Sequence, residues 1–111
     1  FLEVGRGRFA WARFRYKNPR WGQITETQVD DIKTIAATIT SPVYVVGEMG
    51  AAERQIMGRK WKTSRLAPAS TCLRRPSVLA ELAWDKLQVG HADDPVSLSP
   101  IYVHTLSNVP N

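Results

Sequence analysis

The spacing of apolar residues changes its period at Asp30–Asp31, and this change restricts the possible folds most strongly. Before it, residues 8–16 alternate between two faces, which is the period of a β-strand. After it comes an apolar stripe of helical spacing, made of Ile32, Ile35, Ala36 and Ile39. Either aspartate can cap this helix, because a carboxylate accepts hydrogen bonds from the free amides of a first turn. Strands therefore come first, and a helix begins near residue 31.

The residues before the helix predict three strands joined by two turns. An apolar strand covers residues 1–4, a Gly-Arg-Gly turn covers residues 5–7, and the second strand runs from residue 8 to 16. Asn18-Pro19 marks the second turn, and residues 21–29 form the third strand. Strands in this order form a meander. Because the chain opens inside a hairpin, we expect it to be part of a larger protein.

The residues after the helix alternate between strand and helix patterns. Residues 43–46 (VYVV) are uniformly apolar, which is typical of a strand buried on both faces. A short helix over residues 51–57 and a brief strand over residues 65–67 follow. A last helix begins at Pro76 and ends near Gly90, since proline suits a first turn and glycine suits a C-terminal cap. Its expected packing face holds Val78, Leu79, Leu82, Ala83 and Leu87.

This order of patterns predicts one α/β domain over residues 1–111. We expect a mixed sheet with a three-stranded meander, flanked by helices. The order resembles the ribonuclease-H-like half-domain that occurs twice in actin-like sugar kinases. With 43% apolar residues the chain can form a modest core. No apolar run approaches the ~20 residues needed to cross a bilayer, so the sequence predicts no contact with a membrane.

The basic residues of this chain, whose net charge is +5, are unevenly distributed. Residues 1–20 hold six Lys and Arg residues against one acid, Glu3. A second basic cluster lies between residues 54 and 75, with Trp61 among its basic residues. Aromatic residues lie among these charges, so they could follow phosphates and stack on bases. The candidate interaction surface consists of Arg6, Arg8, Arg13, Arg15 and Trp21. Alternatively, these charges only protect exposed strand edges.

The sequence predicts no catalytic, cofactor-binding or metal-binding residues. Neither G-x-x-x-x-G-K-[ST] nor G-x-G-x-x-G occurs in it. His91 and His104 are thirteen residues apart with no second cysteine, which argues against a zinc site. The lone Cys72 fits a reducing compartment and is not expected to be a nucleophile. The amides of residues 47–50 could hold an anion, but Glu48 would repel a phosphate, which favours a plain turn.

Three segments resemble, in order, the second half of bacterial TsaB-family proteins. LEVGRGRFAWARF (residues 2–14) is similar to that family's strand-turn-strand, D-A-R-x-G-E-V-Y-x-A-x-Y. VYVVGEMG (residues 43–50) is similar to its buried strand ending in Gly-acid-Gly. Residues 74–106 resemble its last helix, loop and P-[IL]-Y-[LV]-R tail. The sequence departs from the family pattern, where Asp, Arg, Glu and Arg are usual, at Glu3, Gly5, Arg8 and His104.

The resemblance implies a non-catalytic scaffold with an actin-like ATPase fold, in a family long labelled glycoprotease-like. It also implies that this chain is the second lobe of a two-lobed parent protein. Such scaffolds act in the synthesis of threonylcarbamoyladenosine at position 37 of tRNA. The implied partners are a TsaD-type transferase subunit and a TsaE-type ATPase, with tRNA as a further contact. The implied location is the cytoplasm, and no cofactor is implied. The departures at charged positions bear on contacts with partners rather than on the fold.

Two other functions stay open from the sequence. One is a basic nucleic-acid-binding module that uses the N-terminal hairpin. The other is a glycoprotease-type peptidase, as the older family label suggests, although no nucleophile or metal-binding set supports it. Among the partners, a second copy of the same lobe, forming a homodimer, is a further alternative.

Overall fold

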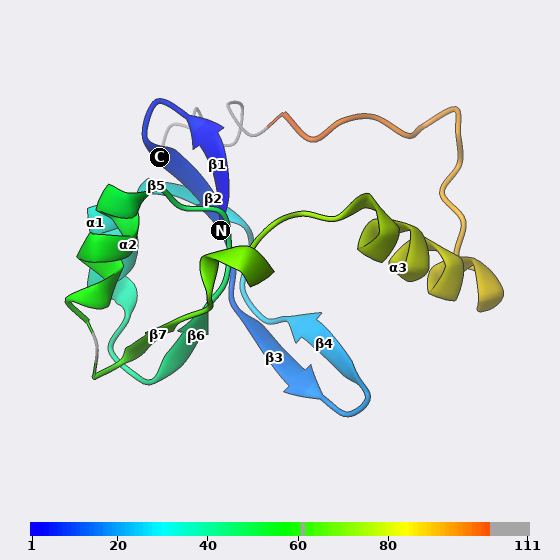
Figure 1. The fold of residues 1–111 in the computed structure, drawn as a ribbon. Helices are drawn as coiled ribbons and strands as arrows, with labels where there is room; N and C mark the ends of the chain where they lie inside the picture. The colour runs from blue at the N-terminus through cyan, green and yellow to red at the C-terminus, as the bar shows by residue number, and fades with distance from the viewer. Residues whose placement is uncertain (61, 103–111) are drawn as a thin grey trace.

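The computed structural model describes residues 1–60 and 62–102, and within them the fold is mixed α/β, as the order of patterns predicts (Figure 1). Trp61 and His104 lie outside the described residues. The strands are β1 (Leu2–Gly5), β2 (Arg8–Trp11), β3 (Phe14–Lys17), β4 (Arg20–Gln23), β5 (Gln28–Asp31), β6 (Val43–Val45) and β7 (Ser64–Leu66). The helices are α1 (Ile32–Thr38), α2 (Ala51–Gly58) and α3 (Pro76–Gln88), with a 3-10 turn at Ala69–Thr71.

The residues predicted to form a three-stranded meander form five strands, which belong to two sheets. β1, β2 and β5 make an antiparallel sheet, and β3 pairs with β4 in a separate hairpin. The predicted second and third strands are therefore each interrupted. At the break, the backbone N–H of Arg13 donates to the hydroxyl oxygen of Thr25 at 2.9 Å, where a continuous ladder would have a carbonyl. The turn at Asn18–Pro19 is confirmed, and its peptide bond is cis.

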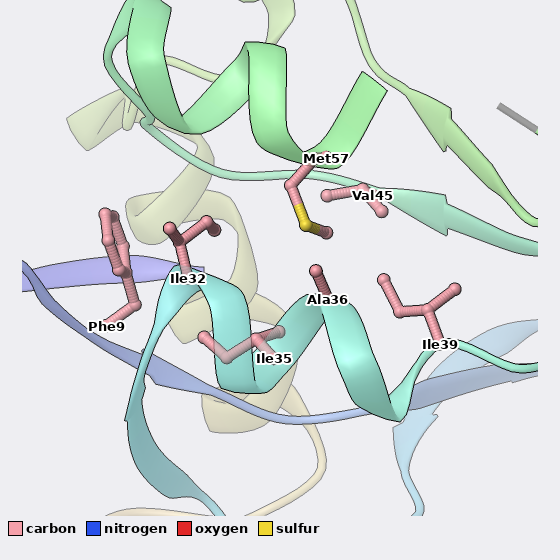
Figure 2. Close-up of a cluster of buried hydrophobic side chains, with 7 residues drawn as sticks. All are labelled: Phe9, Ile32, Ile35, Ala36, Ile39, Val45 and Met57. Carbon is pink, nitrogen blue, oxygen red and sulfur yellow. The ribbon is translucent and has the colours of Figure 1, made fainter. Parts of the chain in front are cut away.

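The core lies where α1 packs on the first sheet (Figure 2). The predicted stripe is confirmed, because all four of its residues are buried. Phe9 of β2 meets this helix from the sheet, and Met57 of α2 and Val45 of β6 close the cluster. Asp31 is the residue that caps α1: its Oδ1 accepts from the amides of Lys33 and Thr34 at 2.8 and 3.0 Å.

β6 and β7 form a parallel pair joined through α2, separate from the other sheets. The predicted single mixed sheet is therefore wrong for the described residues. β6 approaches the first sheet at its end, where the nitrogen of Phe1 donates to the carbonyl oxygen of Val46 at 2.8 Å. The approach requires glycine at position 47, because at its φ of +146° a Cβ would lie 2.7 Å from the Phe1 nitrogen.

The prediction that residues 43–46 are buried on both faces is wrong. Val45 is buried against the core, whereas the side chains of Tyr44 and Val46 are exposed. The reason is that α2 and the core cover one face of the β6–β7 pair and no described element covers the other. A uniformly apolar strand thus presents half of its side chains to solvent.

α3 forms where it is predicted, with Pro76 in its first turn and Gly90 beyond its end at a φ of +78°. The expected burial of its apolar face is wrong, because every residue of the helix is exposed. In Figure 1 the helix stands apart from the sheets, at the end of an extended segment. An amphipathic helix in this position stabilises nothing in its own chain by packing.

Candidate interaction surface

The β3–β4 hairpin projects away from the core (Figure 1). Its register places aromatic residues on one face and basic residues on the other. Tyr16 pairs with Trp21 across the ladder, and Phe14 pairs with Gln23, so these side chains share a face. The neighbouring pairs, Arg15 with Gly22 and Lys17 with Arg20, present their side chains on the opposite face. All eight strand residues of the hairpin are exposed.

Tyr16 and Trp21 form the centre of the aromatic face. Their ring centroids lie 5.5 Å apart with the planes tilted by 55°. This distance lies within the favourable range for aromatic pairs, so the two rings support each other. The exposed fraction of Trp21 is 68%, and large apolar side chains left in water mark a surface that another molecule can cover.

Several hydrogen bonds join the base of the hairpin to the two segments that link it to the core sheet. The amide of Ile24 donates to the carbonyl of Arg13 at 2.9 Å. The side-chain amide of Gln23 donates to the carbonyl of Thr25 at 2.8 Å and to the hydroxyl of Thr27 at 3.2 Å. These bonds hold the two linking segments together at the base of the hairpin.

The structure does not bring the five sequence-predicted surface residues together. Arg15 and Trp21 both lie on the hairpin, but on opposite faces. Arg6 lies in the β1–β2 turn, exposed, with a left-handed φ of +56°. Arg8 and Arg13 are half-buried rather than offered to solvent. The five residues therefore do not share one face of the described structure, and their contact with a partner stays a prediction.

Arg8 and Arg13 have structural roles. A terminal nitrogen (Nη2) of Arg8 donates to the carbonyl of Val29 in β5 at 3.2 Å. The corresponding nitrogen of Arg13 donates at 2.7 Å to the carbonyl of Thr38, at the end of α1. A cation at this position also interacts favourably with the negative end of the helix dipole. Sequence spacing does not reveal this bond, because its partners are 25 residues apart and meet only in the tertiary fold.

A second polar arrangement joins the turn after β6 to the segment that leads into α3. Arg74 donates from Nε and from Nη2 to the two carboxylate oxygens of Glu48, at 3.2 and 3.1 Å. Its backbone amide also donates to Glu48 Oε1 at 3.2 Å. Hydrogen bonds from the Arg74 side chain and backbone lower the pKa of Glu48, and the same carboxylate raises the pKa of Arg74. The turn at residues 47–50 thus binds the guanidinium group of Arg74 through Glu48, rather than an anion. The sequence did not indicate this pair.

Among the described residues, no group of three or more His, Cys, Asp or Glu side chains lies close enough to hold a metal ion. Cys72 is a free thiol and is buried beside the carbonyl of Ala67. Within the same described part of the chain, no helix has the length and apolar character that crossing a membrane requires.

Comparisons of the chain with family models, with curated proteins and with solved structures find no match. The hairpin and α3 both expose large apolar side chains to solvent. Such surfaces are typical of proteins that bind other macromolecules.

Proposed function

We propose that this chain is a non-catalytic interaction lobe of a scaffold protein of the TsaB type, which supports threonylcarbamoyladenosine modification of tRNA. One observation carries the proposal: α3 and the β3–β4 hairpin each expose several large apolar side chains. Apolar surfaces of this kind are typical of sites that bind another macromolecule, as a scaffold requires. The order of the three TsaB-like segments supports the same conclusion.

The proposal includes a ribonuclease-H-like half-domain as the parent fold. Two features support it: the meander β1–β2–β5 is followed directly by a helix that packs on it, and a β6–α2–β7 unit comes next. In this fold the parent protein would have two lobes, of which this chain is the second. The proposed partners are a TsaD-type transferase subunit and a TsaE-type ATPase, in the cytoplasm, where a reduced Cys72 is stable.

A binding experiment with purified components tests this function. The chain, carrying an affinity tag, is mixed with a TsaD-type subunit and with a TsaE-type ATPase, and retention of either is measured. We expect the chain to retain a partner subunit. Trp21→Ala or Leu82→Asp should lower the affinity for that subunit at least tenfold. Tyr44→Ala and Val96→Asp are matched controls, because both residues are as exposed but lie elsewhere. Absence of retention, or equal loss with the controls, would refute the scaffold function.

A second function is favoured by the charge of the hairpin. Its strands hold Arg15, Lys17 and Arg20 and no acidic residue, behind a face that holds Tyr16 and Trp21. Basic side chains that track phosphates, combined with rings that stack on bases, are typical of single-strand recognition. We therefore propose tRNA contact through the hairpin as the alternative, with Arg8 and Arg13 excluded from it because their guanidinium groups bond to backbone carbonyls.

The salt dependence of tRNA binding tests the alternative. Each phosphate contact contributes about 0.7 to the slope of log affinity against log salt for single strands. Replacing Arg15, Lys17 and Arg20 by alanine should lower the slope by about 2. Trp21→Ala should weaken binding without changing the slope, and Arg59→Ala, an exposed arginine after α2, is the control. Undetectable binding at low salt would exclude this function.

A further inference from the structure

We propose that Ser77 is a phosphorylation site for arginine-directed serine kinases, and that the ion pair between Arg74 and Glu48 limits access to it. The sequence is Arg-Arg-Pro-Ser-Val over residues 74–78, so arginines stand three and two positions before the serine. Kinases of this class select substrates by charge, because carboxylates beside their active site pair with these arginines. The inference goes beyond the proposed function, since this modification requires neither partner subunit.

The segment that contains Ser77 is accessible to another protein. Residues 73–78 are all exposed, and residues 74 and 75 belong to neither a helix nor a strand. The backbone of Arg75 is extended, with a φ of −107° and a ψ of 123°, and its side chain has no partner among the described residues. A kinase can therefore bind this part of the chain without displacing any element of the core.

Ser77 itself lies in the first turn of α3, directly after Pro76. A kinase must unwind this turn to reach the hydroxyl group, and little opposes the unwinding, because the turn has no side-chain cap and no residue of α3 is buried. The Oγ atom then forms a bond to the γ-phosphorus of ATP, and the bond from that phosphorus to the β–γ bridging oxygen breaks. ADP leaves, and the hydroxyl proton passes to the catalytic base of the kinase.

The fold favours Ser77 over two other hydroxyl residues that follow a basic run. Thr63 and Ser64 come directly after residues 59–62, which hold three basic side chains. Ser64 is only 5% exposed, at the start of β7. The carbonyl of Thr63 accepts from the amide of Val43 at 2.8 Å, so this residue takes part in the pairing with β6. A kinase would have to separate two strands to reach either residue, whereas Ser77 requires the loss of one exposed helical turn.

The ion pair of Arg74 competes with a kinase for the first of the two arginines. Nε and Nη2 of Arg74 donate to the carboxylate of Glu48 at 3.2 and 3.1 Å, and these bonds must break before a kinase can bind the guanidinium group. The two side chains are 71% and 36% exposed. An ion pair this accessible to water changes an equilibrium constant by no more than about fivefold. The pair therefore slows phosphorylation without preventing it.

Phosphorylation of the full chain tests the site, with ATP and the catalytic subunit of cyclic-AMP-dependent kinase as the probe and mass spectrometry to locate the product. We expect one phosphate per chain, on Ser77, and none in Ser77→Ala. Arg75→Ala should lower kcat/KM at least tenfold, since it removes a charged contact with the kinase. Ser97→Ala is the matched control, because Ser97 is exposed but follows acidic residues at 93 and 94, and its phosphate incorporation should be unchanged. Absence of phosphate on Ser77, or an unchanged rate in Arg75→Ala, would refute the site.

A second variant tests the ion pair. Glu48→Gln keeps the size of the side chain but removes its charge, so kcat/KM for phosphorylation should rise about two- to fivefold. In an Arg74→Ala background the same substitution should have no effect, because the pair is already absent. Glu26→Gln, at an exposed glutamate in another part of the chain, should leave the rate unchanged.

No gain in Glu48→Gln, or a gain that persists in the Arg74→Ala background, would show that the ion pair does not limit access. Circular dichroism verifies that each variant is folded, which is expected because none of these positions belongs to the core. The transferase and ATPase are absent from these assays, so failure of the phosphorylation site is distinguishable from failure of the scaffold function.

Discussion

The guanidinium group of Arg13 donates a hydrogen bond of 2.7 Å to the carbonyl oxygen of Thr38 and so ties the base of the β3–β4 hairpin to the end of α1. Arg13 lies at the point where the long hairpin is interrupted, and Thr38 is the last residue of α1. The bond therefore joins the core to the proposed interaction surface. It also changes the interpretation of an arginine that the sequence places in a basic, nucleic-acid-like segment.

We predict that Arg13→Ala destabilises the fold by roughly 1–3 kcal/mol, the usual cost of removing a partly buried hydrogen bond from a charged donor. The exposed Arg15→Ala is the matched control, and its effect should stay within about 0.5 kcal/mol. Urea unfolding followed by circular dichroism measures both. Equal losses for the two variants would mean that the bond to Thr38 contributes nothing to stability.

A second prediction concerns the indole nitrogen of Trp11, which donates to Oδ2 of Asp30 at 2.8 Å between neighbouring strands. Both side chains are half-buried, so Asp30→Ala leaves the indole N–H without its partner. We expect a loss of about 1–2 kcal/mol in the free energy of unfolding. A double-mutant cycle with Trp11→Phe isolates the bond, and additive effects of the two substitutions would show that it is not stabilising.

The cap of α1 predicts a pH dependence of stability. Hydrogen bonds from the backbone and side chain of Thr34 lower the pKa of Asp31 in the folded state. A carboxylate whose pKa is lowered by folding adds stability above its unfolded pKa, and this contribution is lost as the pH falls through the folded value. The window therefore lies below the ordinary aspartate pKa of 3.8.

The measurement is the urea midpoint between about pH 6 and pH 2, a range that includes the usual titration of carboxylates. Asp31→Asn keeps a good helix cap but removes this titration, so it should flatten part of the acid loss. Asp31→Ala should lower the midpoint at neutral pH as well. Glu48 titrates in the same direction, so some pH dependence should persist in Asp31→Asn. An unchanged pH profile in that variant would contradict the assigned role of the cap.

The burial pattern predicts opposite outcomes for two large side chains. Ile35 is 1% exposed at the centre of the core, so Ile35→Ala should cost about 2–5 kcal/mol, from lost transfer energy and a residual cavity. Tyr44, in an apolar strand, is 63% exposed, and Tyr44→Ala should cost no more than about 0.5 kcal/mol. Thermal unfolding of both variants measures the difference. A large loss for Tyr44→Ala would show that its face of β6 is covered.

The resemblance to the TsaB family can be followed through particular residues. The resemblance places Gly47 at the end of a buried strand. In the structure, Phe1 lies so close to Gly47 that a Cβ at this position would clash with it. Arg8, which departs from the family's usual Glu, bonds to the carbonyl of Val29, a contact that a carboxylate could not make. Whether the chain functions as a scaffold is tested by the binding experiment above.

Local chemistry was sufficient for every element whose signal is contained within a few residues. The helical spacing from Ile32 to Ile39, the cap at Asp31 and the proline and glycine that bound α3 all act through near neighbours, and each is confirmed. The break in the long hairpin depends on Thr25 meeting Arg13, and the arginine contacts depend on segments 21 and 25 residues apart. The exposure of Tyr44 and of α3 likewise depends on which element covers which face. An apolar pattern shows that a residue can be buried, but burial requires a partner surface, and only the arrangement of the whole chain supplies or withholds one.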